Sequence, residues 1–478
     1  MISFFKTLFK KPVDGDVEPG SMREMLWVAL PLVLSSAAET IMQITDRLFL
    51  AHYSDETFRA AFPAGILSFT LLCVFMQVAG YAGTFVAQYH GAKSSKGCLH
   101  ATAQGLWLAL FSMPFILLLT PAGLAIISRS GFEPAVIAEA RDYYLILMLG
   151  GLRLPMSAAI GGYFTGRHML KLNTIANLTG TFVNIPLDYL FIFGGERVGL
   201  PWIPAMGIKG AAYTTVVAGF IPFAMQFWWY LRSRDLREHG WHAAFRLDFP
   251  LMRRIVRFGL PSALYLLMDI SSFSAFFFLI GRLGGLAQMV GNVCISINHI
   301  AFAPLMAIGI ATSIVAARYQ GAREPSHAAR SGWSALKLGW CWMVPLAVLF
   351  VAFPRMFIAP FNPEGGHFSM DEILVLGRPM LAMMAAWGLA DTVNIVMMCA
   401  LRGVGDTRFV MACMGIGGWL LWMPAEVAAH WFFDAGLLVL WGLLTVYIIC
   451  LGGVFAWRWR RGKWKSIRVI EQPVIEET

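Results

Sequence analysis

Carboxyl side chains inside apolar stretches are the residues of this sequence that could do chemistry. Glu39, Gln43 and Asp46 follow one another at the i, i+4, i+7 spacing of one helix face. An ionisable side chain at the centre of a bilayer costs about 2.5–3.5 kcal/mol, so this face must meet a wet cavity or polar partners. The alternative is a structural ion pair, but the adjacent Arg47 would point about 100° away on a helix.

A second polar group follows on a later apolar stretch. Asn184 and Asp188 are four residues apart, and Pro186 lies between them. A proline inside a helix removes one backbone donor and frees a carbonyl one turn earlier. Carboxylate, amide and carbonyl oxygens suit a small cation or a transferable proton, and Thr214 or Thr215 could add a hydroxyl. The alternative is a polar kink that only packs helices together.

Acids recur in the second half of the chain. Asp269 lies in one apolar run, and Asp391 lies in another with Asn394 on the same helix face and Trp387 one turn earlier. His299 can titrate near neutral pH, although a hydrogen-bonded core histidine is the more ordinary interpretation. Buried acids in both halves indicate a protein that moves protons or cations.

The elements that must position these side chains are membrane-spanning helices. Of the 478 residues, 58% are apolar and 14% charged, whereas soluble domains are about 45–50% apolar and about 25% charged. A soluble enzyme, a disulfide-rich secreted module and a disordered chain are therefore excluded. Twelve apolar runs, each long enough to cross a bilayer, lie at Leu26–Leu50, Ala61–Tyr89, Leu99–Leu119, Tyr143–Phe164, Leu172–Phe193, Gly207–Leu231, Ile255–Ile280, Met289–Ala316, Ser331–Phe353, Ile373–Leu401, Phe409–Trp431 and Leu437–Trp457.

The distribution of basic residues predicts the orientation. With twelve spans, 25 of the 37 Lys and Arg residues lie in the tails and the even-numbered loops. The side richer in Lys and Arg is cytoplasmic, so both termini and the midpoint loop are expected in the cytoplasm. The net charge of +9 is then a topology signal, and no nucleic-acid partner is expected.

An internal repeat organises the chain. At a shift of 230 residues Leu30-Pro31 overlays Leu260-Pro261, and AQYHGAK overlays ARYQGAR. The segment around Asp188 resembles that around Glu426 at a shift of 238. Two six-helix halves in the same orientation are implied, with substrate sites between them. The expected parts are a cytoplasmic tail (1–22), an N-lobe (23–231), an inter-lobe loop (232–250), a C-lobe (251–458) and a basic cytoplasmic tail (459–478).

These residues carry a resemblance to the multidrug and toxic compound extrusion (MATE) transporters of bacteria. It rests on the order and spacing of PLVLSSAAETIMQITDRLFLAHY, QYHGAK, GYFTGRHMLKLNTIANLTGTFVNIPLDYLFIFG, MGIKGAAYTTV, FGLPSALYLLMD and ALRGVGDTRF. The resemblance implies an all-α integral membrane fold of twelve helices in two six-helix lobes. It also implies drug export driven by inward flow of Na⁺ or H⁺, with the lobes alternating between inward-open and outward-open states.

The resemblance also assigns roles to residues. Asp46 matches the first-helix aspartate, Asn184 and Asp188 match the N-lobe cation or proton pair, and Thr215 matches the hydroxyl beside them. Na⁺ binding would then fall to Asp46, Asn184 and Asp188.

In the C-lobe, Asp269 stands where many members have a glutamate, and Asp391 matches the helix 10 aspartate. Trp387 replaces an aromatic residue with a hydroxyl, and Trp has no oxygen to offer a cation. Because of both departures, coupling is expected at the N-lobe acids. Glu39, Gln43, Trp387, Asn394 and His299 are candidates for the substrate cleft.

The expected function is an antiporter that exports cationic or amphipathic drugs from the bacterial inner membrane as a monomer. No G-x-S-x-G, H-E-x-x-H or Walker A motif occurs, so neither an enzyme nor a cofactor is expected beyond the coupling ion. A flippase for a lipid-linked precursor is the first alternative, although its cleft should be cationic. A channel or a non-transporting scaffold is the second.

Overall fold

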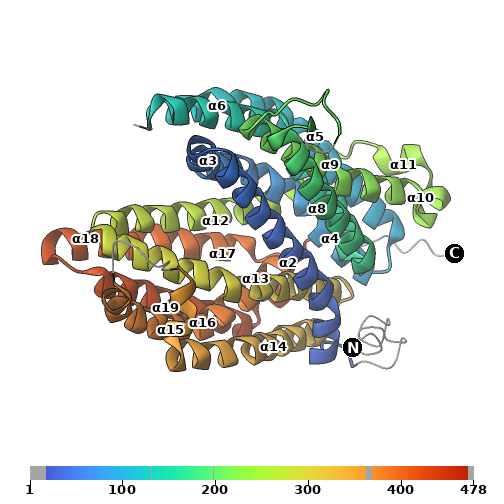
Figure 1. Cartoon of the computed structure of the whole chain (residues 1–478). Helices are drawn as coiled ribbons and strands as arrows, with labels where there is room; N and C mark the ends of the chain where they lie inside the picture. The colour runs from blue at the N-terminus through green and yellow to red at the C-terminus, as the bar shows by residue number, and fades with distance from the viewer. Residues whose placement is uncertain (1–17, 131, 197–198, 362–368, 472–478) are drawn as a thin grey trace, which may run out of the picture. The chain divides into compact units, whose positions relative to one another are not determined.

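The computed structural model describes residues 18–130, 132–196, 199–361 and 369–471, in which all regular secondary structure is helical (Figure 1). The first half holds α2 (Met22–Tyr53), α3 (Asp55–Gly80), α4 (Ala82–Gly91), α5 (Ser95–Ser128), α6 (Pro134–Leu149), α7 (Arg153–Gly166), α8 (Leu170–Phe193) and α9 (Ile208–Leu231). Two short helices, α10 (Arg234–His239) and α11 (Trp241–Phe245), lie in the midpoint loop.

The second half holds a corresponding series of long helices. Its elements are α12 (Phe249–Gly281), α13 (Gly285–Gly321), α14 (Pro325–Ala352), α15 (Pro354–Ile358), η2 (Ala359–Phe361), α16 (Met370–Gly403), α17 (Thr407–Met414), η3 (Gly415–Trp422), α18 (Met423–Phe433), α19 (Leu437–Arg461) and η4 (Lys463–Ser466). Each of the twelve predicted apolar runs falls on one of these helices or on a consecutive set of them.

Some predicted spans are not single straight helices. In the described chain, ten helical segments are long and apolar enough to cross a membrane, and α6 with α7 forms an eleventh that is bent by 42°. The bend falls at Gly150 and Gly151, where the absence of side chains weakens a helix. The twelfth segment, α8, is less apolar because it carries asparagines and Asp188.

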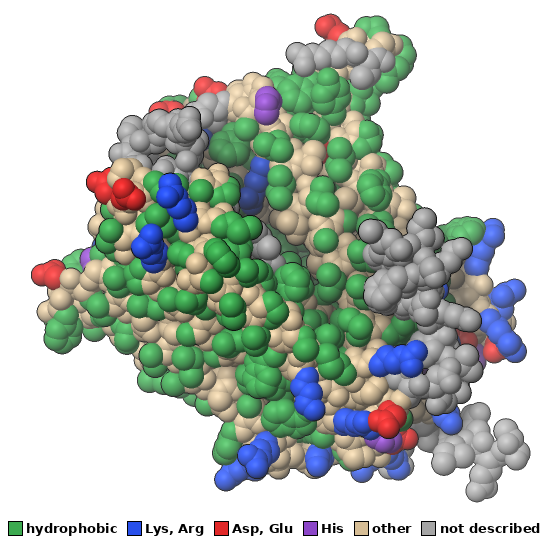
Figure 2. All heavy atoms as spheres, turned by 60° about the horizontal axis from the view of Figure 1, so that its bottom comes forward, with side chains coloured by type: hydrophobic (Ala, Val, Ile, Leu, Met, Phe, Trp, Pro, Cys, Tyr) green, Lys and Arg blue, Asp and Glu red, His purple; other side chains and the backbone are tan. Residues whose placement is uncertain are grey.

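The surface is that of a protein surrounded by lipid. Large apolar side chains such as Phe278, Phe432 and Leu118 are at least three-quarters exposed. Figure 2 shows hydrophobic side chains spread over much of one face, with Lys and Arg gathered toward its edges. In water this surface would drive aggregation, so the helices are membrane spans.

The internal repeat is visible in the backbone and in the contacts at the start of each half. Lys93 and Arg323, which occupy the same repeat position, both adopt a left-handed conformation, with φ of 58° and 61°. Before α2, Glu18 pairs with Arg330, and before α12 Asp248 pairs with His100 at 3.1 Å. Both pairs obey the shift of 230 residues, so the two halves use the same device to hold the segment that leads into their first helix.

The chain divides into two compact units. The C-terminal unit comprises the residues up to Val33 and Leu264–Arg468, and the N-terminal unit comprises Leu34–Ala263 and the residues from Val469. The boundaries of these units lie within α2 and α12. Each of these two helices begins in one unit and continues in the other.

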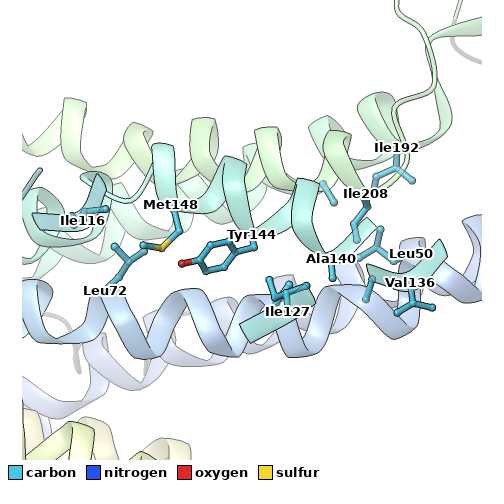
Figure 3. Packing of buried hydrophobic residues seen from close by; sticks show 13 residues of the cluster. Leu50, Leu72, Ile116, Ile127, Val136, Ala140, Tyr144, Met148, Ile192 and Ile208 are labelled. Atoms are coloured by element: carbon cyan, nitrogen blue, oxygen red, sulfur yellow. The ribbon is translucent and has the colours of Figure 1, made fainter. Parts of the chain in front are cut away.

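Close packing holds the N-terminal unit together. Leu50, Leu72, Ile116, Tyr144 and Met148 belong to one buried cluster contributed by α2, α3, α5 and α6 (Figure 3). The helices α4 and α7 touch at two glycines. A Cβ atom on Gly162 would lie 2.7 Å from the Cα of Gly83, so only small residues allow this approach.

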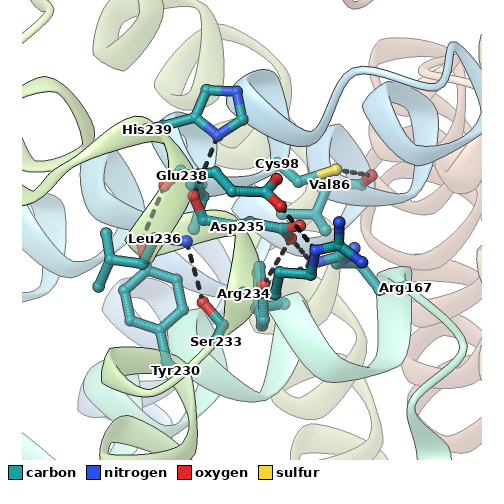
Figure 4. A network of polar contacts seen from close by, with 12 residues as sticks. Val86, Cys98, Arg167, Tyr230, Ser233, Arg234, Asp235, Leu236, Glu238 and His239 are labelled. Carbon is teal, nitrogen blue, oxygen red and sulfur yellow. Dashed lines mark hydrogen bonds and ion pairs between the residues drawn. The ribbon is translucent and has the colours of Figure 1, made fainter.

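The midpoint loop is fixed to the same unit by a polar network (Figure 4). Asp235 at the start of α10 forms an ion pair with Arg167 and accepts a hydrogen bond from the hydroxyl of Tyr163 at 3.1 Å. Ser233 caps α10 by accepting a hydrogen bond from the backbone N–H of Leu236. The loop that the sequence predicted to be polar is therefore ordered by its charges.

Candidate ion- and proton-coupling site

Two acids that lie far apart in the sequence meet in the N-terminal unit. Asp188 is completely buried on α8, which continues as a helix past Pro186, and Asp46 is half-buried on α2. Their carboxyl groups are close enough to share a hydrogen bond when one of them carries a proton. Two ionised carboxylates at such a distance repel each other, and a proton or a cation between them would remove that repulsion.

A hydroxyl and an amide complete this group. Thr214 on α9 donates a hydrogen bond to Oδ1 of Asp188, and Asn184 lies within hydrogen-bonding reach of the same carboxyl group. The hydroxyl next to Asp188 therefore belongs to Thr214. Thr215, the residue favoured by the family resemblance, contacts Tyr143 of α6 instead.

Three oxygens of this site have unused hydrogen-bonding capacity. Among the described residues, no donor reaches Oδ1 of Asp46, Oδ1 of Asn184 or Oδ2 of Asp188, although all three atoms are buried. Buried oxygens without donors are costly, and a proton or a hard monovalent cation between them removes that cost. We call Asp46, Asn184, Asp188 and Thr214 the acid-pair site.

The other two polar residues predicted on the first span lie outside the acid-pair site. Glu39 and Gln43 are exposed on α2, and Glu39 is in electrostatic contact with Arg153 of α7. The spacing that placed Glu39, Gln43 and Asp46 on one face is correct. Of these three residues, only Asp46, which is nearest the end of α2, comes close to Asp188 on α8.

The C-terminal unit brings together a different pair of acids. Asp269 on α12 and Asp391 on α16 interact electrostatically. Nδ2 of Asn394 donates a hydrogen bond to Oδ1 of Asp391 at 2.9 Å. The ring of Tyr265 lies near both carboxyl groups. Two acids and a tyrosine hydroxyl from α12 and α16 therefore interact within the C-terminal unit.

Two further predicted cleft residues are placed apart from this pair. Trp387 is buried on α16 and stacks on Trp441 of α19, with 5.3 Å between ring centroids. It therefore packs helices together. His299 is exposed on α13.

Sequence reasoning missed Tyr143. This residue lies near Asp46 and Asp188 and contacts Thr215. A tyrosine within an apolar run is common, and nothing in its spacing singles it out. Its position depends on how α6 packs against α9, which the sequence pattern does not give.

Comparisons with known proteins agree with this arrangement. A model of the MatE family matches residues 31–190 and 261–427, that is, once in each half and starting at Pro31 and Pro261. A crystal structure of a MATE protein in complex with MaL6 has 17% identity and a TM-score of 0.81, covering 94% of this chain and 98% of that chain.

Two further solved structures are equally similar. One is an outward-facing multidrug resistance MATE family transporter, with 16% identity and a TM-score of 0.82. The other is a MOP superfamily transporter from Pyrococcus furiosus with a binding pocket described as of reverse polarity, with 17% identity and a TM-score of 0.82. Both alignments cover 94% of this chain and 98% of the other. The likeness confirms the predicted all-α fold of twelve spanning helices in two lobes.

Proposed function

We propose, from the premise that this chain belongs to the MATE family of multi-pass membrane transporters, that it is a secondary antiporter that exports cationic or amphipathic organic compounds. Inward flow of H⁺ or Na⁺ drives the export in this proposal. The protein would act as a monomer in a bacterial inner membrane, with both termini in the cytoplasm. No cofactor other than the coupling ion takes part.

The acid-pair site is the observation that carries the proposal. Asp46 and Asp188 come from two different helices, and both are neighbours of the same buried oxygens. A site of this kind changes its affinity for H⁺ or Na⁺ when either helix moves, because the oxygens then separate. Binding of the ion on one side of the membrane and its release on the other is what resets an antiporter.

The acids of the C-terminal unit are suited to attract a cationic substrate. Asp269 and Asp391 interact electrostatically, and the aromatic ring of Tyr265 lies near both. Negative charge beside aromatic faces attracts lipophilic cations. A flippase for a pyrophosphate-linked lipid would instead need a cationic cleft. Since one similar transporter is described as having a pocket of reverse polarity, this alternative needs a direct test.

The test is ethidium efflux from proteoliposomes under an imposed H⁺ gradient or an imposed Na⁺ gradient. We expect efflux to respond to one of the two gradients, and Asp46→Asn and Asp188→Asn to abolish that response. The matched control is Asp434→Asn, because Asp434 is exposed at the end of α18 with φ of 46°, a conformation that Asn accepts. No response of the unmodified protein to either gradient would refute the antiporter and favour the flippase.

A further inference from the structure

Another buried acid lies outside both groups described above. Glu426 on α18 has no exposed surface. Its Oε1 accepts a hydrogen bond from Nε1 of Trp422 at 2.6 Å, and its Oε2 has no hydrogen-bond partner in the described part of the chain. No ion pair between described residues includes it.

Aromatic rings surround Trp422, the residue that donates the hydrogen bond to this carboxyl group. Trp422 stacks on Tyr447 of α19 with a centroid distance of 4.8 Å and an interplanar angle of 4°. Trp422 also packs against Phe276 and Phe273 of α12, with ring-centroid distances of 5.4 Å and 5.6 Å. An ionised carboxylate in such surroundings lacks the hydrogen bonds and counter-charge that would offset its desolvation. The neutral, protonated form is therefore favoured in this conformation.

The internal repeat places Glu426 at the position of Asp188. The shift of 238 residues that overlays the two acids also overlays Asn184 on Trp422, and the shift of 230 overlays Asp46 on Phe276. The C-terminal unit thus repeats the geometry of the acid-pair site with one acid and aromatic rings instead of two acids and an amide. Rings supply no oxygen ligands, so this version suits a proton and not Na⁺.

A segment of π-helix lies directly before the helix that carries Glu426. The residues Gly415–Trp422 form a π-helix that ends one turn before Glu426, and such segments are rare and frequent at functional sites. Within it, a Cβ atom on Gly418 would lie 3.3 Å from the hydroxyl of Tyr447. A shift to α-helical register would rotate Trp422 and open the enclosure of the carboxyl group.

Few other titratable groups face Glu426. His430 lies one turn later on the same helix, and Tyr447 lies on α19. The nearby residues of α12 are the two phenylalanines and Ser272, which do not titrate. On α16 the nearest face carries Trp387, with Asp391 one turn beyond. Between described residues, no ion pair joins a Lys or Arg side chain to Glu426 or Asp391. A change in protonation at this place can therefore come from Glu426, His430 or Tyr447, and substitution of Glu426 separates them.

We propose that Glu426 is a second proton-binding site of the transporter. Its carboxyl group holds a proton in the conformation described here and releases it to water when the rings of Trp422 and Phe276 separate. The step is a simple acid dissociation, in which the O–H bond breaks and the carboxylate keeps the electron pair. This inference rests on the proposed antiport, to which it adds a proton step in the C-terminal unit.

Infrared difference spectroscopy of the reconstituted full-length protein tests the protonation. Spectra recorded across a pH titration report the C=O stretch of a protonated carboxylic acid. We expect one such band to disappear in Glu426→Gln, which keeps the volume and can still accept the hydrogen bond from Trp422. The band should remain in the control Glu238→Gln, an exposed residue of α10. Persistence of every band in Glu426→Gln would overturn the proposal.

Efflux measurements then separate a transported proton from a structural one. With a pH gradient across proteoliposomes, we expect Glu426→Gln to slow ethidium efflux about ten-fold and to change its pH profile, whereas Glu426→Asp should restore part of the rate. A missing band with an unchanged pH profile would show a purely structural acid and would also overturn the proposal. If the unmodified protein fails to respond to any gradient, the proposed antiport falls, while the infrared band still decides whether Glu426 binds a proton.

Discussion

The hydroxyl of Thr214 on α9 donates a hydrogen bond to Oδ1 of Asp188 on α8. The same hydroxyl also reaches the backbone carbonyls of Gly210 and Ala211, at 3.1 and 3.0 Å. It is thus held in place by its own helix while it points at the acid. The relationship links the last two helices of the first half at the acid-pair site.

Replacement of Thr214 should change the affinity of the acid-pair site for the coupling ion. A hydrogen bond donated to a carboxylate stabilises its ionised form and is worth about 1.5–3 kcal/mol. If the ion is H⁺, Thr214→Val should shift half-maximal efflux to an about ten-fold lower H⁺ concentration. If the ion is Na⁺, loss of the hydroxyl oxygen should raise the Na⁺ concentration needed by about ten-fold. Efflux from proteoliposomes at graded H⁺ or Na⁺ concentrations measures this effect.

Two valine variants serve as comparisons for Thr214. Thr215→Val should have a smaller effect, because Thr215 contacts Tyr143 and not Asp188. Thr179→Val should have none, because Thr179 is half-buried outside the acid-pair site and its hydroxyl bonds the carbonyl of Ile175 in its own helix. An equal shift in Thr214→Val and Thr179→Val would contradict the assignment.

Substitution of an acid of the C-terminal unit should weaken binding of the substrate more than binding of the coupling ion. Asp391→Asn removes one of the two interacting acids but keeps the polar contact with Asn394. We expect the KM for ethidium to rise about ten-fold, which corresponds to about 1.4 kcal/mol, while efflux still responds to the ion gradient. Loss of the gradient response with an unchanged KM would place ion coupling in this unit instead.

The ion pair that fixes the midpoint loop should contribute to stability. The side chains of Asp235 and Arg167 are only 11% and 19% exposed. Asp235→Asn leaves the guanidinium without its counter-charge, and we expect the free energy of unfolding to fall by about 2 kcal/mol. Thermal unfolding in detergent, followed by loss of the monodisperse elution peak, measures the change in Tm.

A second pair on the same short helix provides the control. The Arg234 guanidinium lowers the pKa of Glu238 below its ordinary value, so the pair is charged at neutral pH. Both side chains are largely exposed to water, where solvent screens the attraction. Glu238→Gln should therefore leave the Tm unchanged, and a loss as large as that of Asp235→Asn would show that the loop is not held by the buried pair.

The contact between Gly83 and Gly162 should tolerate no added methyl group. In Gly162→Ala the new Cβ would lie 2.7 Å from the Cα of Gly83, and we expect α4 and α7 to separate at a cost of about 1–3 kcal/mol. Gly453→Ala on α19 is the control, because nothing lies within 4 Å of the added atom. The same thermal assay should show a lower Tm for Gly162→Ala only.

The sequence by itself determined the class of protein, the twelve spans and the two halves. Apolar run length is a local property, and a helix in lipid must satisfy its own backbone hydrogen bonds, so run length gives the spans. The internal repeat gives the two halves. The spacing of Asn184 and Asp188 also placed both residues correctly on one face of α8.

Only the tertiary structure decided which side chains meet. Spacing gives positions on one helix, but the neighbours of Asp188 come from α2 and α9, whose rotation depends on packing against other helices. The sequence therefore left Thr214 and Thr215 undecided and gave no sign of Tyr143. Glu426 shows the same limit, because its repeat position was visible in the sequence and its enclosure by Trp422 and Phe276 was not.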